Sequence, residues 1–348
     1  MPEIALYRKY RPTNFDEVVG QDHIIEALKG AIKNNKTSHA YLFSGSRGIG
    51  KTSIARILAR ELKISDNDLF EIDGASNTGV DDVRELREAV WSLPFDSAMK
   101  AYLIDEVHML SKSAFNALLK TLEEPPAHVI FMLATTEMHK IPDTIISRCE
   151  VHTLKRPSDE VLAGVVEKIS KKEKFNLDSG AARTIAFLGD GSFRDTIGIL
   201  QKVLSASADK KITSVEVEKI TGAPSLWLVF NFILSIMDSD PAGGLSITNK
   251  SAEENRDFKI FAKLVLREIR LAMLLKFAPA MEKELLEGMG QEEKDFLNDL
   301  KNRANSHILP AVLKEMISAY EMIGYAYLPQ LPIELALIKL TGGEKESK

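Results

Sequence analysis

Five short runs of apolar residues lie in the first part of the chain, and helical patterns separate them. The runs are AYLFSG (40–45), DLFEIDG (68–74), AYLID (101–105), VIFMLATT (129–136) and EVHTL (150–154). Short, nearly continuous apolar runs are typical of strands that are buried on both faces. The pattern therefore predicts an α/β fold in which a parallel sheet is covered by helices on both sides.

A longer helical pattern precedes the first of these runs. The segment FDEVVGQDHIIEALKGAIKNN (15–35) ends at a pair of asparagines, and its apolar positions follow a helical period. These positions are Val18, Ile24, Ile25, Leu28 and Ile32. The spacing predicts an amphipathic helix with one side packed on the core.

After KRPSD (155–159) the strand signals stop, and a small helical unit without strands is expected. Its segments are SDEVLAGVVEKISKK (158–172), DSGAARTIAFLGD (178–190) and SFRDTIGILQKVLS (192–205). Each opens with a serine or aspartate, the residue types that cap helix N-termini. The segment TGAPS (221–225) marks the next expected boundary.

The rest of the chain reads as helical again. The segment 258–277 carries two apolar stripes, one with Phe258, Phe261, Val265 and Ile269, the other with Ile260, Leu264, Leu271 and Leu275. The core of its own domain explains one stripe, and a contact with another subunit would explain the second. The predicted division is residues 1–156, 157–222 and 223–341, followed by a frayed polar tail, 342–348.

Composition narrows the class of protein. The chain has 348 residues, one cysteine and a net charge of −5. A single cysteine excludes a disulfide framework and fits the cytoplasm, and no apolar stretch reaches the roughly 20 residues that span a bilayer. MPEIALYRKYRP lacks the apolar block of a secretory signal. The charge argues against a uniformly basic coat for nucleic acid but not against a local basic groove.

The strongest chemical motif follows the first apolar run. GSRGIGKTS fits G-x-x-x-x-G-K-[ST] and consists of Gly45, Ser46, Arg47, Gly48, Ile49, Gly50, Lys51, Thr52 and Ser53. In such a P-loop the backbone amides hold phosphates at a helix N-terminus, the lysine binds the β- and γ-phosphates and the threonine binds Mg²⁺. An ordinary glycine-rich turn is the alternative. A strand signal before the motif and a helical signal after it favour an ATP site.

The third apolar run ends in an acidic pair. Asp105 is expected to bind Mg²⁺ through water, and Glu106 to polarise the attacking water. A solvated loop is the common setting of an Asp-Glu pair, but an apolar strand after a P-loop favours catalysis. His108 lies nearby and is expected to be a structural or surface histidine.

Two further polar residues have positions that suit a phosphate site. Thr136 ends the fourth run, where its hydroxyl would orient water or touch the γ-phosphate; capping the strand end is the alternative. Arg194 in GSFRD begins a helix of the small unit, from which it would reach the γ-phosphate. A surface role is the usual one for such an arginine.

These motifs, in this order, resemble those of AAA+ ATPases. YRKYRPTNFDEVVGQ, HAYLFSGSRGIGKTS, YLIDEVHMLSKSAFNALLKTLEEPP and the SRC of residues 147–149 are similar to the gamma/tau subunits of bacterial DNA polymerase III. The resemblance is close over roughly the first 220 residues and weaker beyond. It implies a P-loop domain, a helical lid and a helical collar domain that joins subunits. It further implies an ATPase that loads the sliding clamp onto primed DNA.

The resemblance also assigns residues. It implies that Arg148 of SRC acts in trans on the ATP of a neighbouring subunit, with a salt bridge inside the chain as the alternative. The N-terminal YRKYRP segment (7–12), with Val18 and Val19, would correspond to the part that wraps the adenine and ribose, and Arg11 is the residue placed there. Cys149 is expected to be a small packing residue.

Two departures from this family change the expectations. A four-cysteine zinc module is usual after the P-loop helix, whereas ARELKISDNDLFEID (59–73) contains no cysteine, so zinc should be absent. The family tracks DNA phosphates with a helix start that here begins at Thr78, with Asp81 completing a capping box. Asn77 and Gly79 stand there where relatives are basic. Arg84, Lys112 and Lys120 remain for DNA, and a solvated surface role is an alternative for both lysines.

Two other functions stay open. A branch-migration or unwinding helicase shares the P-loop and the acidic pair, but would normally bring a winged-helix DNA reader. A non-catalytic scaffold subunit would carry the arginine of SRC alone, and the intact Lys51, Thr52, Asp105 and Glu106 argue against it.

Overall fold

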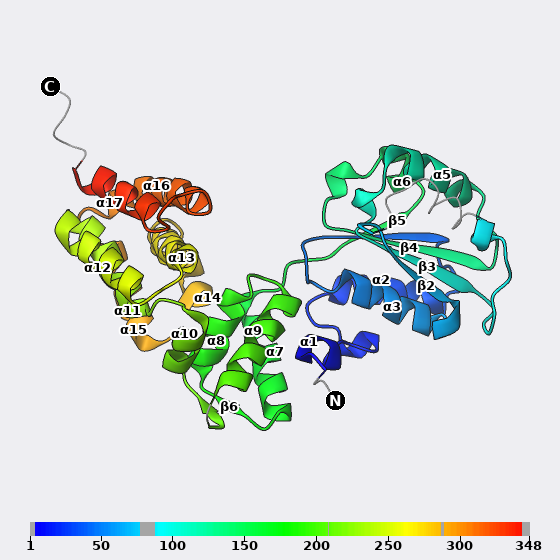
Figure 1. Ribbon diagram of the computed structural model, residues 1–348, viewed down its shortest axis with the longest axis horizontal. Helices are drawn as coiled ribbons and strands as arrows, with labels where there is room; N and C mark the ends of the chain where they lie inside the picture. The colour runs from blue at the N-terminus through cyan, green and yellow to red at the C-terminus, as the bar shows by residue number, and fades with distance from the viewer. Residues whose placement is uncertain (1–3, 77–87, 208, 287–288, 343–348) are drawn as a thin grey trace. The chain divides into compact units, whose positions relative to one another are not determined.

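The computed structural model describes residues 4–76, 88–207, 209–286 and 289–342 (Figure 1). The chain separates into two compact units. The first contains residues 1–175 and 185–204, and the second contains residues 176–184 and 205–348. The dividing line runs through the helical segment after residue 157, so the predicted boundaries at 156 and 222 remain predictions.

The first unit is built on a five-stranded sheet. Its strands are β1 (Ala40–Ser44), β2 (Leu69–Asp73), β3 (Lys100–Asp105), β4 (Val129–Thr135) and β5 (Glu150–Thr153). They lie in the order β2-β3-β4-β1-β5, and each neighbouring pair is parallel. The fold class predicted from the five apolar runs is therefore confirmed.

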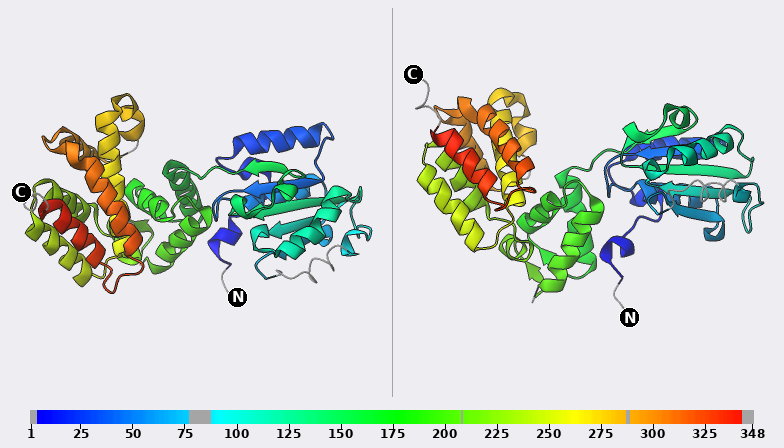
Figure 2. Two further views of the ribbon diagram at one scale, coloured as in Figure 1. Left: turned by 90° about the horizontal axis from the view of Figure 1, so that it is seen from above. Right: turned by 45° about the horizontal axis from the view of Figure 1, so that its top comes forward.

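Helices cover both faces of this sheet (Figures 1 and 2). Tyr41 and Phe43 of β1 pack in one core with α2 (Asp22–Lys33) and α3 (Lys51–Glu61). Leu42 points the other way, into a second core with α5 (Lys112–Glu123) and α6 (Asp143–Ile146). Successive strand residues face opposite sides, so burial on both faces requires the uninterrupted apolar runs seen in the sequence.

The helix expected over residues 15–35 is two pieces. A short helix, η1 (Phe15–Glu17), is separated from α2 by an extended stretch, and Gly20 there has φ +77°. Gln21 fixes this break: its amide donates to the Lys155 carbonyl at 2.7 Å and accepts from the Lys155 backbone N–H at 3.0 Å. Val18 therefore lies outside the helix, in extended backbone.

The helices that follow residue 157 are α7 (Asp159–Lys172), α8 (Ser179–Leu188), α9 (Phe193–Ala206) and α10 (Ser214–Thr221), and the first three begin at the predicted caps. Ser158, Asp178 and Ser192 each accept a hydrogen bond from the backbone amide three residues ahead. The prediction that this unit has no strands was wrong, because β6 (Asn176–Leu177) and β7 (Lys211–Ile212) form a short parallel pair. Two residues are too few for a strand period to be visible in the sequence.

The rest of the second unit is helical. It contains α11 (Leu226–Met237), α12 (Pro241–Glu253), α13 (Phe258–Phe277), α14 (Glu282–Leu286), α15 (Gln291–Asn302), α16 (Leu309–Met322) and α17 (Leu331–Gly342). In the second stripe of α13, Leu264, Leu271 and Leu275 are buried within the chain itself. A subunit contact is therefore not needed to explain them.

Among the described residues no single helix has the length and hydropathy to cross a membrane, although the bent pair α10 and α11 passes by length and composition.

Glu268 is a fully buried carboxyl group in α13. Burial raises its pKa to about 8; the Arg267 guanidinium at 3.2 Å lowers the pKa, and the Glu293 carboxylate raises it further. A carboxyl whose folded pKa exceeds its unfolded value stabilises the fold at low pH, and this contribution is lost as the pH rises towards the folded pKa. Glu268 should therefore make the chain less stable at pH 8 than at pH 5.

We expect Glu268→Gln to remove this dependence, because glutamine keeps the shape but carries no titrating proton. The variant should melt several degrees above the wild type at pH 8, and the difference should shrink at pH 5. Thermal unfolding at both pH values measures it, with Glu321→Gln on the exposed face of α16 as the control. A difference of equal size at both pH values would contradict the expectation.

Candidate nucleotide-binding site

The loop between β1 and α3 has the backbone of a phosphate cradle. Gly45, Gly48 and Gly50 have φ values of +138°, +75° and +108°, in a region that residues with a side chain rarely adopt. Gly50 is the N-cap of α3, so the free amides of the helix start face the loop. The glycines of the motif are therefore needed for the shape of the turn, as well as for the approach of a phosphate.

Gly48 also brings the start of α9 to the loop. A Cβ atom on Gly48 would lie 2.0 Å from the Ser192 hydroxyl, and the Arg194 amide donates to the Gly48 carbonyl at 3.4 Å. The Arg194 side chain is exposed, and its guanidinium lies 5.9 Å from the centre of the Tyr7 ring. The structure thus places Arg194 beside the P-loop, where the sequence predicted it.

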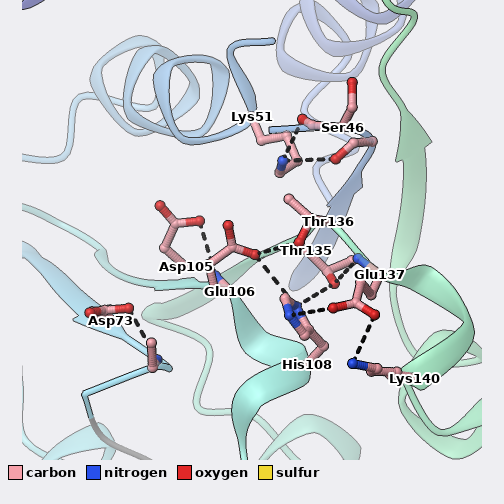
Figure 3. A network of polar contacts seen from close by, with 12 residues as sticks. Ser46, Lys51, Asp73, Asp105, Glu106, His108, Thr135, Thr136, Glu137 and Lys140 are labelled. Carbon is pink, nitrogen blue, oxygen red and sulfur yellow. Dashed lines mark hydrogen bonds and ion pairs between the residues drawn. The ribbon is translucent and has the colours of Figure 1, made fainter. Parts of the chain in front are cut away.

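Lys51 carries a positive charge into this loop while it is 5% exposed. Its ammonium group donates to the carbonyls of Gly45 at 2.8 Å and Ser46 at 2.9 Å (Figure 3). Burial lowers the pKa of Lys51, and the nearby Glu106 and Asp105 carboxylates partly offset that effect. An anion bound in the loop would stabilise the charged form of this lysine.

The two residues expected to hold Mg²⁺ are in direct contact. The Thr52 hydroxyl donates to Asp105 Oδ2 at 2.8 Å. Mg²⁺ is usually held by one or two carboxylates together with substrate phosphates, so a hydroxyl and a carboxylate beside a phosphate cradle suit it. Within the described ranges no group of three or more His, Cys, Asp and Glu side chains could hold a metal by itself.

Glu106 follows β3 in a left-handed conformation, with φ +47°. For a residue with a side chain this conformation is uncommon and costs free energy. Its Oε2 atom accepts a hydrogen bond from the Thr136 hydroxyl at 2.9 Å. Thr136 therefore acts on the acidic pair: it touches Glu106 from the end of the neighbouring strand (Figure 3).

These residues surround a cavity of about 190 Å³ within the first unit. Most of the predicted site lines it: Arg11, Val18, Val19, Arg47, Gly48, Ile49, Gly50, Lys51, Thr52, Ser53, Asp105, Glu106 and Arg194. Arg11 is fixed by a hydrogen bond from its Nε to the Ser53 hydroxyl at 2.9 Å. Gly45, Ser46 and Thr136 lie behind the lining, in contact with Lys51 or Glu106.

Several lining residues were not named individually from the sequence, although the first two belong to the YRKYRP segment expected around the adenine and ribose. Tyr7 and Tyr10 come from the N-terminal segment, Val165 from α7, and Phe193 and Ile197 from α9. An apolar residue on a helix looks the same in the sequence whether it faces a core or a ligand. The YRKYRP segment was the available signal for the tyrosines.

Arg148 does not line this cavity. Its guanidinium pairs with Glu123 at 2.5 Å and donates to the Thr144 carbonyl at 2.6 Å, and its side chain is 33% exposed. The ion pair inside the chain, the alternative raised above, is thus present in the single chain. Cys149 next to it packs against the second core, and burial raises the pKa of its thiol to about 11, as suits a packing residue.

The residues considered for contacts with DNA fall into two groups. Asn77, Thr78, Gly79, Asp81 and Arg84 lie outside the described residues. Lys112 and Lys120 are exposed on α5.

Comparison with known proteins assigns this arrangement to a family. The tau subunit of DNA polymerase III from Bacillus subtilis is 38% identical over 97% of this chain, and that of Escherichia coli is 33% identical over 96%. The family model for the DNA polymerase III delta subunit matches residues 20–69 and 61–158. The chain belongs to the DNA polymerase III gamma/tau family.

Like the P-loop domain, the helical part is included in this similarity, because the alignments cover nearly the whole chain. The chain itself spans 63% of the Bacillus subtilis subunit and 55% of the Escherichia coli subunit. Among solved structures, the Holliday junction branch migration motor RuvB of Thermotoga maritima superposes with a TM-score of 0.54. It is 18% identical, over 87% of this chain and 91% of RuvB, so this likeness concerns the fold.

Proposed function

We propose that this gamma/tau family member is the ATP-hydrolysing motor subunit of the clamp loader of DNA polymerase III. It would place the sliding clamp on primed DNA during replication, in the cytoplasm. The family assignment supports this proposal. The observation that carries it is the buried Lys51 ammonium, which lies beside Thr52 and Asp105, two residues that are hydrogen-bonded to each other. A scaffold subunit without catalysis would have no need for a buried charge that a phosphate stabilises.

ATP would enter with its phosphates against the P-loop amides and Lys51. The adenine and ribose would lie towards Val18, Val19 and Ile197, the apolar part of the cavity lining, with Arg11 alongside. A flat aromatic base prefers such a surface because binding there removes apolar area from water. Thr52 and Asp105 would hold Mg²⁺, which when bound neutralises charge on the β- and γ-phosphates.

Hydrolysis would depend on four further side chains. Glu106 polarises the attacking water, and Thr136 holds the Glu106 carboxylate by the 2.9 Å hydrogen bond. Arg194, beside Gly48, reaches the γ-phosphate from the start of α9. Arg148 neutralises the transferred phosphoryl group of the ATP in the adjoining subunit.

The partners follow from the same role. They are other clamp-loader subunits, the sliding clamp and primer–template DNA bound through its phosphates, with Lys112 and Lys120 exposed for such contacts. Zinc is not expected, since the cysteines of the family's zinc module are missing from residues 59–73.

ATPase activity measured with and without partners tests this function. The chain alone should hydrolyse ATP slowly, and candidate partner subunits, clamp and primed DNA together should raise the rate by about 10³-fold or more, since Arg148 is then supplied in trans. Clamp transfer to primed DNA should require ATP. Full activity of the monomer, or ATP-driven unwinding of forked or four-way DNA without clamp transfer, would contradict it.

A further inference from the structure

We propose that His108 is a positioning residue for Glu106: its ring braces the Glu106 carboxylate in the direction that the attacking water needs, and Glu137 orients the ring. This role rests on the proposed ATPase function. It differs from the surface or merely structural histidine expected from the sequence.

His108 is placed between two carboxylates. It lies in η3 (Val107–Met109), two residues after Glu106, and its side chain is 5% exposed. Its Nδ1 atom lies 3.5 Å from Glu106 Oε2, and its Nε2 atom lies 3.3 Å from Glu137 Oε1 (Figure 3). A buried imidazole in contact with the proposed catalytic carboxylate is close enough to limit its movement.

Two other groups hold the ring, Thr135 at Nδ1 and Glu137 at Nε2. The Glu137 backbone N–H donates to the Thr135 hydroxyl at 3.0 Å, and the same hydroxyl lies 3.1 Å from His108 Nδ1. The hydrogen bond from Lys140 at 2.8 Å is the main cause that lowers the pKa of Glu137. Glu137 is therefore an ionised acceptor at neutral pH, and at 3.3 Å from Nε2 it favours the His108 tautomer that carries its proton on that atom. Thr135 and Glu137 together fix the ring plane.

Glu106 is thus held from two directions. The Thr136 hydroxyl donates to Oε2 at 2.9 Å, and Nδ1 on the edge of the His108 ring lies 3.5 Å from the same atom, where the ring limits rotation of the carboxylate. The Glu106 side chain is 31% exposed and starts from a left-handed backbone, so nothing in its own conformation fixes the carboxylate. A misplacement of about 1 Å in a catalytic group can cost roughly 100-fold in rate, which is the advantage of such a brace.

Three variants of the full chain test the role in the assembled complex with primed DNA. His108→Leu removes both ring nitrogens, His108→Asn keeps an amide near the Nδ1 position, and Glu137→Gln weakens the hold on Nε2. For His108→Leu we expect kcat to fall by about 10- to 100-fold with little change in the dissociation constant for ATP. Glu137→Gln should show a smaller fall of the same kind, and His108→Asn should recover part of the rate.

His139→Gln is the matched control, since His139 is 77% exposed and lies 3.7 Å from the same Glu137 carboxylate. It should keep kcat. An unchanged kcat in His108→Leu, with Glu106→Gln inactive, would overturn the positioning role alone. So would parallel losses of kcat, ATP affinity and melting temperature in His108→Leu and Glu137→Gln.

If His108→Leu does not fold, Glu137→Gln decides the question, because Glu137 is 36% exposed and its replacement leaves the core intact. An unchanged kcat in that variant overturns the role. Normal hydrolysis by Glu106→Gln would instead contradict the proposed function, on which the brace depends.

Discussion

Glu106→Gln should slow ATP hydrolysis by about 10²- to 10⁴-fold while ATP binding stays nearly unchanged. The amide has the shape of the carboxylate, and its oxygen can still accept the Thr136 hydrogen bond. It cannot take up a proton or polarise water with a full negative charge. Single-turnover hydrolysis in the assembled complex, together with a nucleotide titration, separates the two effects.

The matched control is Glu26→Gln, on the exposed face of α2 in the same unit. It should hydrolyse ATP at the wild-type rate. If Glu106→Gln stays within a few-fold of the wild type, another group polarises the water. If the variant instead loses ATP binding, Glu106 contributes to the ground state rather than to the chemical step.

The part of this site that could be predicted consists of residues that lie close together in the sequence. β1 and the P-loop are contiguous, and Asp105 and Glu106 follow an apolar strand directly. Because the strands of a parallel sheet end at one edge, each strand-end residue could be assigned to that edge without coordinates. Thr136 was found in this way, and its contact with Glu106 places it beside the acidic pair.

The surroundings of His108 were not predictable in the same way. Its contacts come from Glu106 just after β3, from the end of β4 and from the turn after β4, and they depend on the left-handed backbone of Glu106. A period of 3.6 or 2 residues says nothing about a side chain that follows such a turn. The break in the helix at Gly20 was not predicted for a related reason. The apolar spacing continues across Gly20, whereas the helical conformation of the backbone does not.

The proposed site has two parts: one lies within a single chain, and the other would be supplied by a neighbouring subunit. The cavity lining, the Thr52–Asp105 contact and Glu106 are complete within the first unit. Arg148 is the exception, since it pairs with Glu123 and does not line the cavity of its own chain. A surface ion pair of this kind is worth about 0–1 kcal/mol, so the guanidinium can exchange Glu123 for a phosphate at small cost.

Arg148→Ala should therefore lower hydrolysis by the assembled complex by about 10³-fold or more, with little effect on melting temperature or on ATP binding by the chain that carries it. The reason is that, in the proposed mechanism, the lost charge acts on the neighbour's phosphoryl group. Steady-state ATPase with primed DNA and clamp measures the loss. Arg60→Ala, an exposed arginine of α3, is the control and should be fully active.

A mixture of two inactive variants distinguishes action in trans from action in cis. Glu106→Gln chains keep Arg148, and Arg148→Ala chains keep a complete catalytic carboxylate. If Arg148 acts on the neighbour, a Glu106→Gln chain lends its arginine to the intact site of an Arg148→Ala chain, and part of the activity returns. If it acts within its own chain, every site in the mixture lacks one essential group and the mixture stays inactive, which would refute the shared site.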